Sequence, residues 1–266
     1  MRQSTETKRA LIVVRTYPSP TEHGVESSCT AAITEAGEWL RLYPVRYRYL
    51  PGDKQFSKYQ WVDIAVSKSS DPRLESYAPD HDSIKILGAP LPTANAWRAR
   101  KEIIFPLMAP SLCHLQSGCN ENGYPTLGLF KPKRIDEFRI IDSPEPHWTP
   151  KQLALLRQQH MFEESPKQEL EKIPFYFYYY FKCADPSCNG HKLSCTDWEM
   201  GESYRKWRRE YGNGWEEKFR EKYEAWMTNQ DLHFFVGTMQ QYPCSWIIIG
   251  LFYPPVSQQS EIMFFL

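Results

Sequence analysis

Residues 29–45 read CTAAITEAGEWLRLYPV, and this stretch decides the fold class of the first half of the chain. Two β-like runs flank residues 35–37, which suit a hairpin turn. The two leucines of WLRLY share one face of the second run, while Trp39, Arg41 and Tyr43 share the other. If the leucines face a core, the opposite face displays two aromatic rings and an arginine. The pattern therefore predicts a hairpin with one face available to a ligand.

Further β-like runs lie on both sides of this hairpin, at residues 11–17, 59–67, 83–87, 126–130 and 135–141. A helical spacing of apolar residues occupies residues 93–105. The proline-rich PEPHWTP, residues 144–150, is typical of a linker. We therefore expect a β-rich domain at residues 1–145 and a second domain at residues 146–266.

The second half mixes helices with strands. A capped helix is predicted from residue 149, and the aromatic IPFYFYYYFKC, residues 173–183, indicates a buried strand. Two amphipathic helices follow, separated by the glycines of residues 212–214. Two apolar strands, LHFFVGTM and SWIIIGLFY, end the pattern. The fold class expected is α+β, a β-rich barrel followed by a mixed domain with two helices.

Composition narrows the function classes. The net charge of the 266 residues is zero, which argues against coating nucleic acid by charge alone but allows a local basic groove. The polar start MRQSTETKRA indicates no signal peptide, and no window approaches the ~20 apolar residues of a membrane span. Seven cysteines, an odd number, favour free thiols or metal ligands over a disulfide framework. We expect a cytoplasmic protein that does not contact membranes.

Basic residues interleave with aromatic residues at 39–48, 97–101, 131–139 and 205–209. Cations bind phosphates and flat rings stack on unpaired bases, so such clusters suit nucleic-acid binding. A single cluster is more often the solvated face of an amphipathic element. Three of the four clusters fall in the β-rich segment, which favours binding there. The candidate contact residues are Trp39, Arg41, Arg46, Arg48, Lys131, Lys133 and Arg134.

Three motifs also carry a resemblance to a known group. LIVVRTYPSP (residues 11–20), the opening stretch and LGLFKPKRIDEF (residues 127–138) resemble bacterial proteins with paired oligonucleotide-binding (OB) folds, the dual OB-containing domain proteins. The resemblance covers residues 9–142. It implies an OB-like barrel that binds DNA or RNA, in a mobile-element or phage-defence (antiviral) setting. It assigns no catalytic residues.

The stretch FKCADPSCNGHKLSCTDWE, residues 181–199, holds a candidate zinc site. Cys183, Cys188, His191 and Cys195 are the ligand types that zinc prefers, and the intervening turns suit a metal loop. The order of the gaps differs from that of retroviral zinc knuckles, so no ligand role follows from the motif. The alternative is that the cysteines are small buried residues. A weaker cluster around Cys113, with its neighbouring histidine, is more often structural than metal-binding.

The same stretch also offers a catalytic alternative. His191, Asp197 and Glu199 could serve a metal-dependent nuclease or related hydrolase. The lysine that restriction-type nucleases carry just after the second acid is missing here, and Asp197 suits the N-terminus of the following helix. The sequence therefore leaves enzymatic activity open.

The leading hypothesis is a nucleic-acid-binding protein with a metal-stabilised C-terminal domain. A third hypothesis, from a different class, is an interaction subunit that docks a protein partner through the apolar tail IMFFL, residues 262–266.

Overall fold

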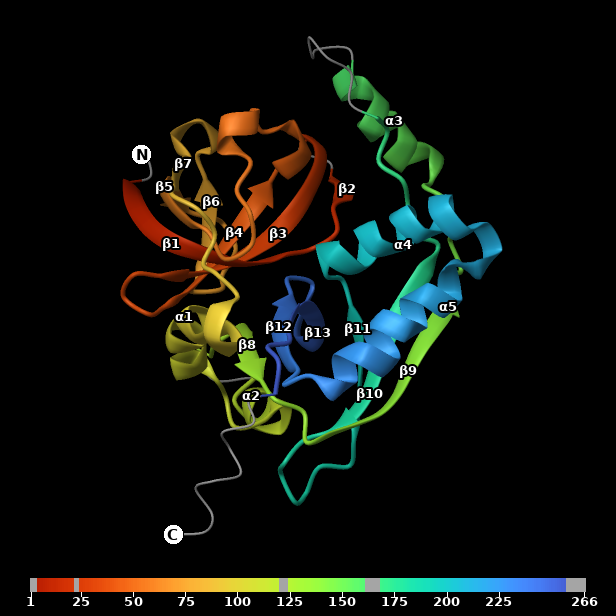
Figure 1. The fold of residues 1–266 in the computed structure, drawn as a ribbon. Coiled ribbons are helices and arrows are strands. Elements are labelled where there is room, and N and C mark those ends of the chain that lie inside the picture. Colours follow the sequence, from red (N-terminus) through yellow and green to blue (C-terminus); the bar gives the residue numbers. More distant parts are fainter. Residues whose placement is uncertain (1–3, 22–23, 120–123, 161–167, 257–266) are drawn as a thin grey trace.

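The chain forms two β-sheets that pack against each other, and the computed structural model describes residues 4–21, 24–119, 124–160 and 168–256 (Figure 1). The first sheet is built from the N-terminal strands. These are β1 (Thr5–Arg15), β2 (Ser19–Thr21), β3 (Gly24–Thr34), β4 (Trp39–Val45), β5 (Trp61–Lys68), β6 (Ser76–Pro79) and β7 (Lys85–Leu87).

Five of these strands close into a barrel. β1 pairs with both β3 and β5, so the order β1-β3-β4-β6-β5 returns to β1. β4 and β6 run parallel, whereas the other neighbouring pairs in the ring run antiparallel. This closed five-strand barrel is compatible with the OB-like fold expected from the sequence.

The predicted hairpin forms between β3 and β4. Gly37 turns the chain with a φ of 78°, a left-handed conformation that glycine adopts at little cost. Its N–H donates to the carbonyl of Thr34 at 2.9 Å. The two leucines of the second run face the barrel interior, as the pattern predicted. They pack there with Ala10, Ile12, Ala32, Val62, Ile64 and Val66.

The second sheet has the strand order β8-β12-β13-β11-β10-β9. β11 and β13 run parallel, and the remaining neighbours are antiparallel. Its strands are β8 (Leu127–Phe130), β9 (Arg134–Asp142), β10 (Phe175–Lys182), β11 (His191–Cys195), β12 (His233–Met239) and β13 (Tyr242–Phe252). A barrel and a mixed sheet with helices confirm the α+β prediction.

Helices cover one face of this sheet. α4 (Trp198–Tyr211) and α5 (Trp215–Arg220) lie across the end of the sheet that carries β9, β10 and β11 (Figure 1). Phe219 of α5 stacks on Phe177 of β10, with ring centroids 4.4 Å apart. The other helices are α1 (Ala94–Ile104), α2 (Leu112–Ser117) and α3 (Pro150–His160). Within the described ranges, no helix is both long and apolar enough to cross a membrane.

The aromatic strand β10 is buried on one face rather than on both. Its burial alternates, because Phe177, Tyr179 and Phe181 face the helices while Tyr176 on the opposite face is exposed. The run of aromatic residues hid this period of two, since both faces carry rings.

The boundary expected near residue 145 does not separate the two sheets. β8 and β9 precede that position, yet β8 pairs with β12 and β9 pairs with β10. The change of sheet falls between β7 and β8, where α1 and α2 lie. We therefore propose that the two structural units divide at this helical segment.

A shared core joins the barrel to the second sheet. The outward faces of β1 and β3 pack against β8, β12 and β13. Two glycines permit this close approach: a Cβ at Gly250 would lie 2.7 Å from the Val14 side chain, and one at Gly201 would overlap the Tyr17 ring. The backbone N–H of Tyr17 also donates to the carbonyl of Thr196 at 2.8 Å. We call this contact region the junction.

One disulfide is present, between Cys119 after α2 and Cys244 of β13. The other five cysteines are free. The sequence favoured free thiols or metal ligands, and the Cys119–Cys244 bond departs from that expectation. The apolar tail at residues 262–266 lies outside the described residues, so its predicted docking role stays a prediction.

Candidate metal centre and junction pocket

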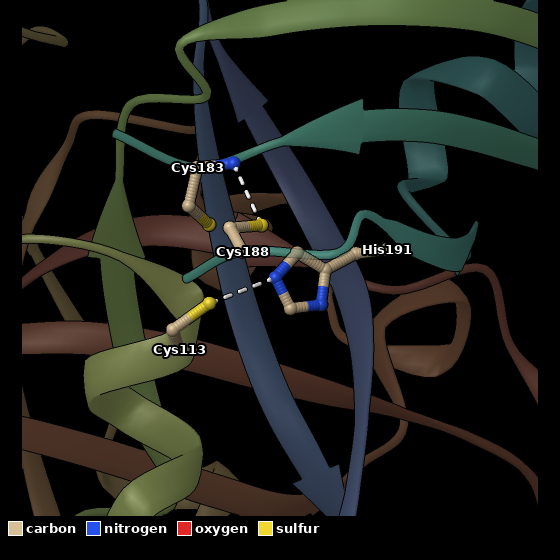
Figure 2. A group of neighbouring side chains, drawn as sticks. All are labelled: Cys113, Cys183, Cys188 and His191. Carbon is tan, nitrogen blue, oxygen red and sulfur yellow. Dashed lines mark hydrogen bonds between the residues drawn. The ribbon is translucent and has the colours of Figure 1, made fainter. Parts of the chain in front are cut away.

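Three cysteines and a histidine converge at the β10–β11 loop, where these two strands of the second sheet end (Figure 2). Cys113 comes from α2, Cys183 and Cys188 come from the loop between β10 and β11, and His191 begins β11. Their ligand atoms all lie within 4.8 Å of one another. The Cys113 Sγ is 3.2 Å from the Nε2 of His191. We call these four residues the Cys/His cluster.

The β10–β11 loop is folded by its own polar groups. Asp185 accepts hydrogen bonds from the N–H and hydroxyl of Ser187, and its carbonyl accepts from the N–H of Cys188 at 3.1 Å. Gly190 has a φ of 103°, a conformation that residues with a Cβ rarely adopt. This tight turn brings His191 back toward the two cysteines that precede it.

Three thiols and one imidazole form a complete donor set for a structural zinc ion, which is four-coordinate. The backbone N–H of Cys183 donates to the Cys188 Sγ at 3.2 Å, a contact that would support a thiolate. Burial acts to raise the pKa of Cys188, but this donor and the N–H of Gly190 outweigh it and the pKa is lowered. The residues present therefore fit a metal in type, number and placement.

The fourth ligand differs from the sequence prediction. Cys195 lies four residues along β11 from His191, which is about 13 Å in an extended strand, so the two cannot share a metal. Its side chain is buried in the core under the helices. Cys113 takes its place. The sequence showed Cys113 as part of a weaker cluster, but nothing in the local pattern linked it to residues 183–191.

The proposed catalytic trio is divided between two places. His191 belongs to the Cys/His cluster, whereas Asp197 and Glu199 follow the far end of β11, about 20 Å along the chain. Asp197 caps α4, as the sequence indicated, and accepts the N–H of Glu199 at 2.7 Å. These three residues therefore do not form one site.

Asp197 is held in the junction by partners from distant segments. The residue is 3 % exposed, and its Oδ2 accepts the N–H of Leu251 at 2.9 Å. Lys58 of the barrel places its Nζ 3.5 Å from the same oxygen and 3.7 Å from Glu199. Burial raises the pKa of Asp197, and Lys58 opposes that rise. Because donors engage both oxygens of Asp197, its carboxylate serves the fold rather than an open metal site.

A cavity of about 440 Å³ opens beside this ion pair. The barrel contributes Arg15 and the loop residues 57–59, while α1 and its preceding residue contribute Thr93, Trp97 and Arg100. Glu199 and Tyr253 line it from the second unit. We call it the junction pocket. Several groups with shifted pKa values gather here, a feature common at functional sites.

Two aromatic residues of the junction pocket have unusual backbone conformations. Tyr59 has a φ of 65° and Trp97 a φ of 64°, both left-handed. For bulky residues this conformation costs about 1–3 kcal/mol each, and such strain concentrates at functional sites. Tyr59 is 5 % exposed, and its hydroxyl has no hydrogen-bond partner among the described residues. Burial raises the pKa of this hydroxyl, so Tyr59 is a neutral donor.

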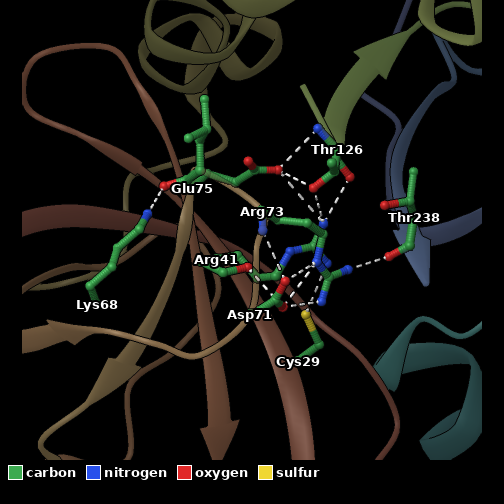
Figure 3. Close-up of polar contacts among 10 residues, drawn as sticks. Cys29, Arg41, Lys68, Asp71, Arg73, Glu75, Thr126 and Thr238 are labelled. Carbon is green, nitrogen blue, oxygen red and sulfur yellow. Dashed lines mark hydrogen bonds and ion pairs between the residues drawn. The ribbon is translucent and has the colours of Figure 1, made fainter. Parts of the chain in front are cut away.

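Two of the predicted nucleic-acid contacts lie in the junction instead of on the surface. Trp39 packs edge-on against Phe235, and Arg41 is 3 % exposed. The guanidinium of Arg41 donates to the carbonyl and hydroxyl of Thr126 and lies 3.8 Å from Glu75 (Figure 3). The alternation correctly placed this face outside the barrel. The second sheet covers Arg41 and part of Trp39, whereas Tyr43 of the same face is 40 % exposed.

The other predicted contacts are dispersed over the surface. Arg48 bridges Glu26 to the carbonyl of Gln168, and Arg46 is exposed. Lys131, Lys133 and Arg134 are also exposed, before and at the start of β9. Lys131 forms an ion pair with Asp231 at 2.6 Å, and Arg134 forms one with Asp136. Arg46 and Arg48 follow β4 of the barrel, whereas Lys131, Lys133 and Arg134 lie beside or on β9 of the second sheet, and their role in binding stays a prediction.

A different face combines rings and cations, and the sequence did not single it out. Tyr176, Tyr178 and Tyr180 alternate along β10, on the side away from the helices. Arg139 of β9 pairs with Tyr178, and Lys192 of β11 pairs with Tyr180. We call the outer side of β9, β10 and β11 the tyrosine face. The local sequence carried little signal for it, because Tyr179 interrupts the alternation of tyrosine with phenylalanine in FYFYYYFK and both faces of the strand carry rings.

Comparison with known proteins places the chain in a family. Residues 108–265, more than half of the chain, match the model described as Domain of unknown function (DUF8757), and the chain belongs to this family. Residues 6–106 match a second model, described as Domain of unknown function (DUF8758). The two models meet in the segment where the sheets change. No curated protein matches the sequence.

Among solved structures, one titled "Structure of murine DNA binding protein bound with ds DNA" aligns with 12 % identity and a TM-score of 0.33. The alignment covers 95 % of this chain and 100 % of the other. A TM-score at this level carries no argument about fold or function.

Proposed function

We propose that this DUF8757 family member binds single-stranded nucleic acid through the tyrosine face, and that zinc bound by the Cys/His cluster fixes the loop beside that face. One observation carries the proposal: three tyrosines point outward from one strand, and cations lie against the rings of two of them. The guanidinium of Arg139 lies 4.8 Å from the Tyr180 ring centroid. The Lys192 ammonium lies 4.4 Å from the Tyr178 ring centroid.

The geometry suits unpaired bases. Tyr176 is 44 % exposed, and the centroids of Tyr176 and Tyr178 are 6.3 Å apart. Outward rings on a sheet can stack successive bases that are free of a duplex, while neighbouring cations bind the phosphates. A duplex would hide its base faces, so the proposal is for a single strand.

Charge on the tyrosine face favours an anionic ligand. Cations exceed acids there, and two acidic side chains are already in ion pairs: Glu137 with Arg139 and Asp136 with Arg134. The excess positive charge comes from Lys182 and Lys192. Lys182 lies opposite Arg134 in the β9–β10 strand pairing. The OB-like strand order of the barrel also favours nucleic-acid binding, although the residues proposed to contact the nucleic acid lie on the other sheet.

The Cys/His cluster adjoins this face. A cavity of about 390 Å³ is lined by residues 180–182 and 189–192, together with the ion-paired Asp136 and Glu137. Zinc would tie Cys183 and Cys188 to His191, and Lys192 follows directly. A bound metal would therefore hold one cation of the tyrosine face in place.

Binding of labelled oligonucleotides tests the first part. We expect a single-stranded probe to bind more tightly than its duplex, and Tyr178→Ala to weaken binding about 5- to 150-fold, because stacking contributes ~1–3 kcal/mol per base. Lys192→Gln should reduce the salt slope by about 0.7 if it contacts one phosphate. Tyr211→Ala is the matched control, since Tyr211 is 49 % exposed at the end of α4. Equal binding by wild type and Tyr178→Ala, or undetectable binding at low salt, contradicts the proposal.

Metal analysis of untagged protein tests the second part. We expect one zinc per chain, lost in Cys188→Ser and kept in Cys195→Ser. This pair of variants is informative because both cysteines lie in one stretch, but only Cys188 belongs to the cluster. Retention of zinc by Cys188→Ser, or its loss from Cys195→Ser with the fold intact, would refute the assignment.

A further inference from the structure

The junction pocket has a charge pattern that its own residues leave incomplete. Lys58 is neutralised by Asp197 and Glu199. Arg15 and Arg100 also line the cavity, and within the described part of the chain neither guanidinium forms an ion pair with a carboxylate. Three cations, Arg15, Lys58 and Arg100, therefore stand against the two carboxylates of Asp197 and Glu199, which leaves one excess positive charge at the cavity.

Both guanidiniums are held rigidly by aromatic rings. The Arg15 guanidinium lies 3.7 Å from the Tyr47 ring centroid, and the Arg100 guanidinium lies 4.1 Å from that of Tyr59. Stacking fixes the plane of a guanidinium and leaves its N–H edge free to donate. Arg100 uses two N–H groups on the carbonyl of Leu91, at 2.8 and 2.6 Å. The Nη1 of Arg15 is buried without a hydrogen-bond partner in the described residues.

The Tyr59 hydroxyl is a second donor without an acceptor. Its residue is nearly fully buried and lines the same cavity. A buried donor without an acceptor is costly, and buried polar groups in native proteins almost always have partners. Both donors belong to residues that line this cavity, and an acceptor brought by a ligand would satisfy them.

We propose that the junction pocket binds a small phosphorylated ligand of nucleotide size, whose phosphate accepts hydrogen bonds from Arg15, Arg100 and Tyr59. A phosphate has acceptor oxygens and negative charge, which match two guanidiniums and a neutral hydroxyl. Glu199, the acid lining the cavity, accepts from hydroxyl groups of the ligand, since an acid would repel a second phosphate. The volume lies within the ~300–1,000 Å³ typical of small-molecule sites.

This site is independent of the proposed nucleic-acid contact. The lining of the junction pocket shares no residue with the tyrosine face. Its formation requires the barrel, α1 and the second unit together, so the ligand would also bridge the two family regions.

The test is calorimetric titration of the full chain with inorganic phosphate, a nucleoside monophosphate and a 5′-phosphorylated oligonucleotide. We expect the monophosphate to bind more tightly than phosphate alone, and Arg100→Gln to weaken it at least tenfold. Arg98→Gln on the same helix is the matched control, because Arg98 is exposed and paired with Glu102. If the oligonucleotide binds best and Arg100→Gln weakens it, the phosphate comes from a nucleic-acid end and the site assignment stands.

Tyr59→Phe keeps the test decisive if the arginine variant fails to fold. It removes a hydroxyl without a protein partner, so the free protein should melt at the same or a higher temperature. Binding of the monophosphate should nevertheless fall about tenfold, as for a lost hydrogen bond to a charged group. Unchanged affinity in Tyr59→Phe, no binding of any probe, or loss of monophosphate binding in Tyr178→Ala overturns the proposal. The last variant separates this site from the tyrosine face.

Discussion

The Cys/His cluster and the junction bring polar groups together in different ways. Three of the four cluster residues come from one short loop, residues 183–191, and α2 supplies the fourth. The junction pair of Lys58 and Asp197 is separated by 139 residues. The cluster lies at the end of two strands of one sheet, whereas the junction lies between two sheets. A site whose residues lie in one loop can therefore be found from their spacing in the sequence. A site formed between two packed sheets cannot, because its residues are far apart in the chain.

The two regions also differ in what a ligand would do. At the cluster, the protein groups are similar donors that need a cation to hold them together. At the junction, Lys58 and two carboxylates already satisfy one another, and the unsatisfied groups lie beside them. The cluster should therefore depend on its ligand for stability more than the junction does. The following predictions test this contrast.

Chelation should give the largest loss of stability. Zinc binding contributes ~10–16 kcal/mol in small zinc domains, and part of that free energy should be lost when a chelator removes the metal. We expect a lower melting temperature for wild type with chelator in thermal unfolding. Cys113→Ser should melt lower without chelator and respond to it no further. A chelator response that persists in Cys113→Ser would remove Cys113 from the site.

Lys58→Met should destabilise the protein by about 3–5 kcal/mol, because it leaves the buried carboxylate of Asp197 without its counter-charge. Urea unfolding measures the loss, and adding Asp197→Asn should recover part of it. Lys54→Met is the control: Lys54 pairs with the exposed Asp82, so its loss should be below ~1 kcal/mol. Similar losses in the two lysine variants would show that the junction pair is not special.

Gly201→Ala should destabilise by about 1–3 kcal/mol, because the new Cβ overlaps the Tyr17 ring and forces the barrel away from α4. The sign is informative, since alanine is otherwise the better helix former by ~1 kcal/mol. Gly214→Ala provides the comparison, because its nearest neighbour would be 3.9 Å away. A stabilised Gly201→Ala protein would mean that the junction is loosely packed.

Lowering the pH should reduce the stability of the junction through protonation of Asp71. We expect this to be the smallest of the four predicted effects on stability. Burial acts to raise the pKa of Asp71, but donors from Arg73 outweigh it, so the folded pKa is below the ordinary value. The unfolded state therefore takes up the proton first. This stabilisation is complete above the unfolded pKa near 4 and is lost as the pH falls through the folded pKa.

Arg73 also donates to the carbonyl of Thr238 at 2.6 Å, which links this pair to β12 (Figure 3). Asp71→Asn should consequently show a flatter acid limb when unfolding free energy is measured from pH 6 to pH 2. An unchanged limb would show that Asp71 titrates alike in both states.

Most elements of the fold could be predicted because each is a local pattern. The β3–β4 hairpin followed from its glycine turn and the inward leucines, and the helix at residue 198 followed from its aspartate cap. The boundary between the two structural units was harder to predict from the sequence. β9 precedes the prolines near residue 145 but pairs with β10 beyond them. Proline marks a break in local structure, and it carries no information about which strands pair afterwards.

The candidate sites, like the fold, could be predicted where their residues are neighbours in the sequence. The loop cysteines and His191 share a spacing that a turn can close, so they were visible. Cys113 was not tied to them, because it lies 70 positions before Cys183 in the chain and only the packing of α2 brings it to the loop. Trp39 and Arg41 were placed on the correct face, yet the second sheet packs against both of them.

The sequence by itself determined the periods: which side chains share a face of a strand, where turns occur and which loop holds soft ligands. Only the tertiary structure decided which faces meet water and which meet the other sheet. Periodicity is a property of neighbours along one chain segment, set by backbone geometry. Burial depends on the apolar surface that distant segments can offer, and that is settled when the layers pack.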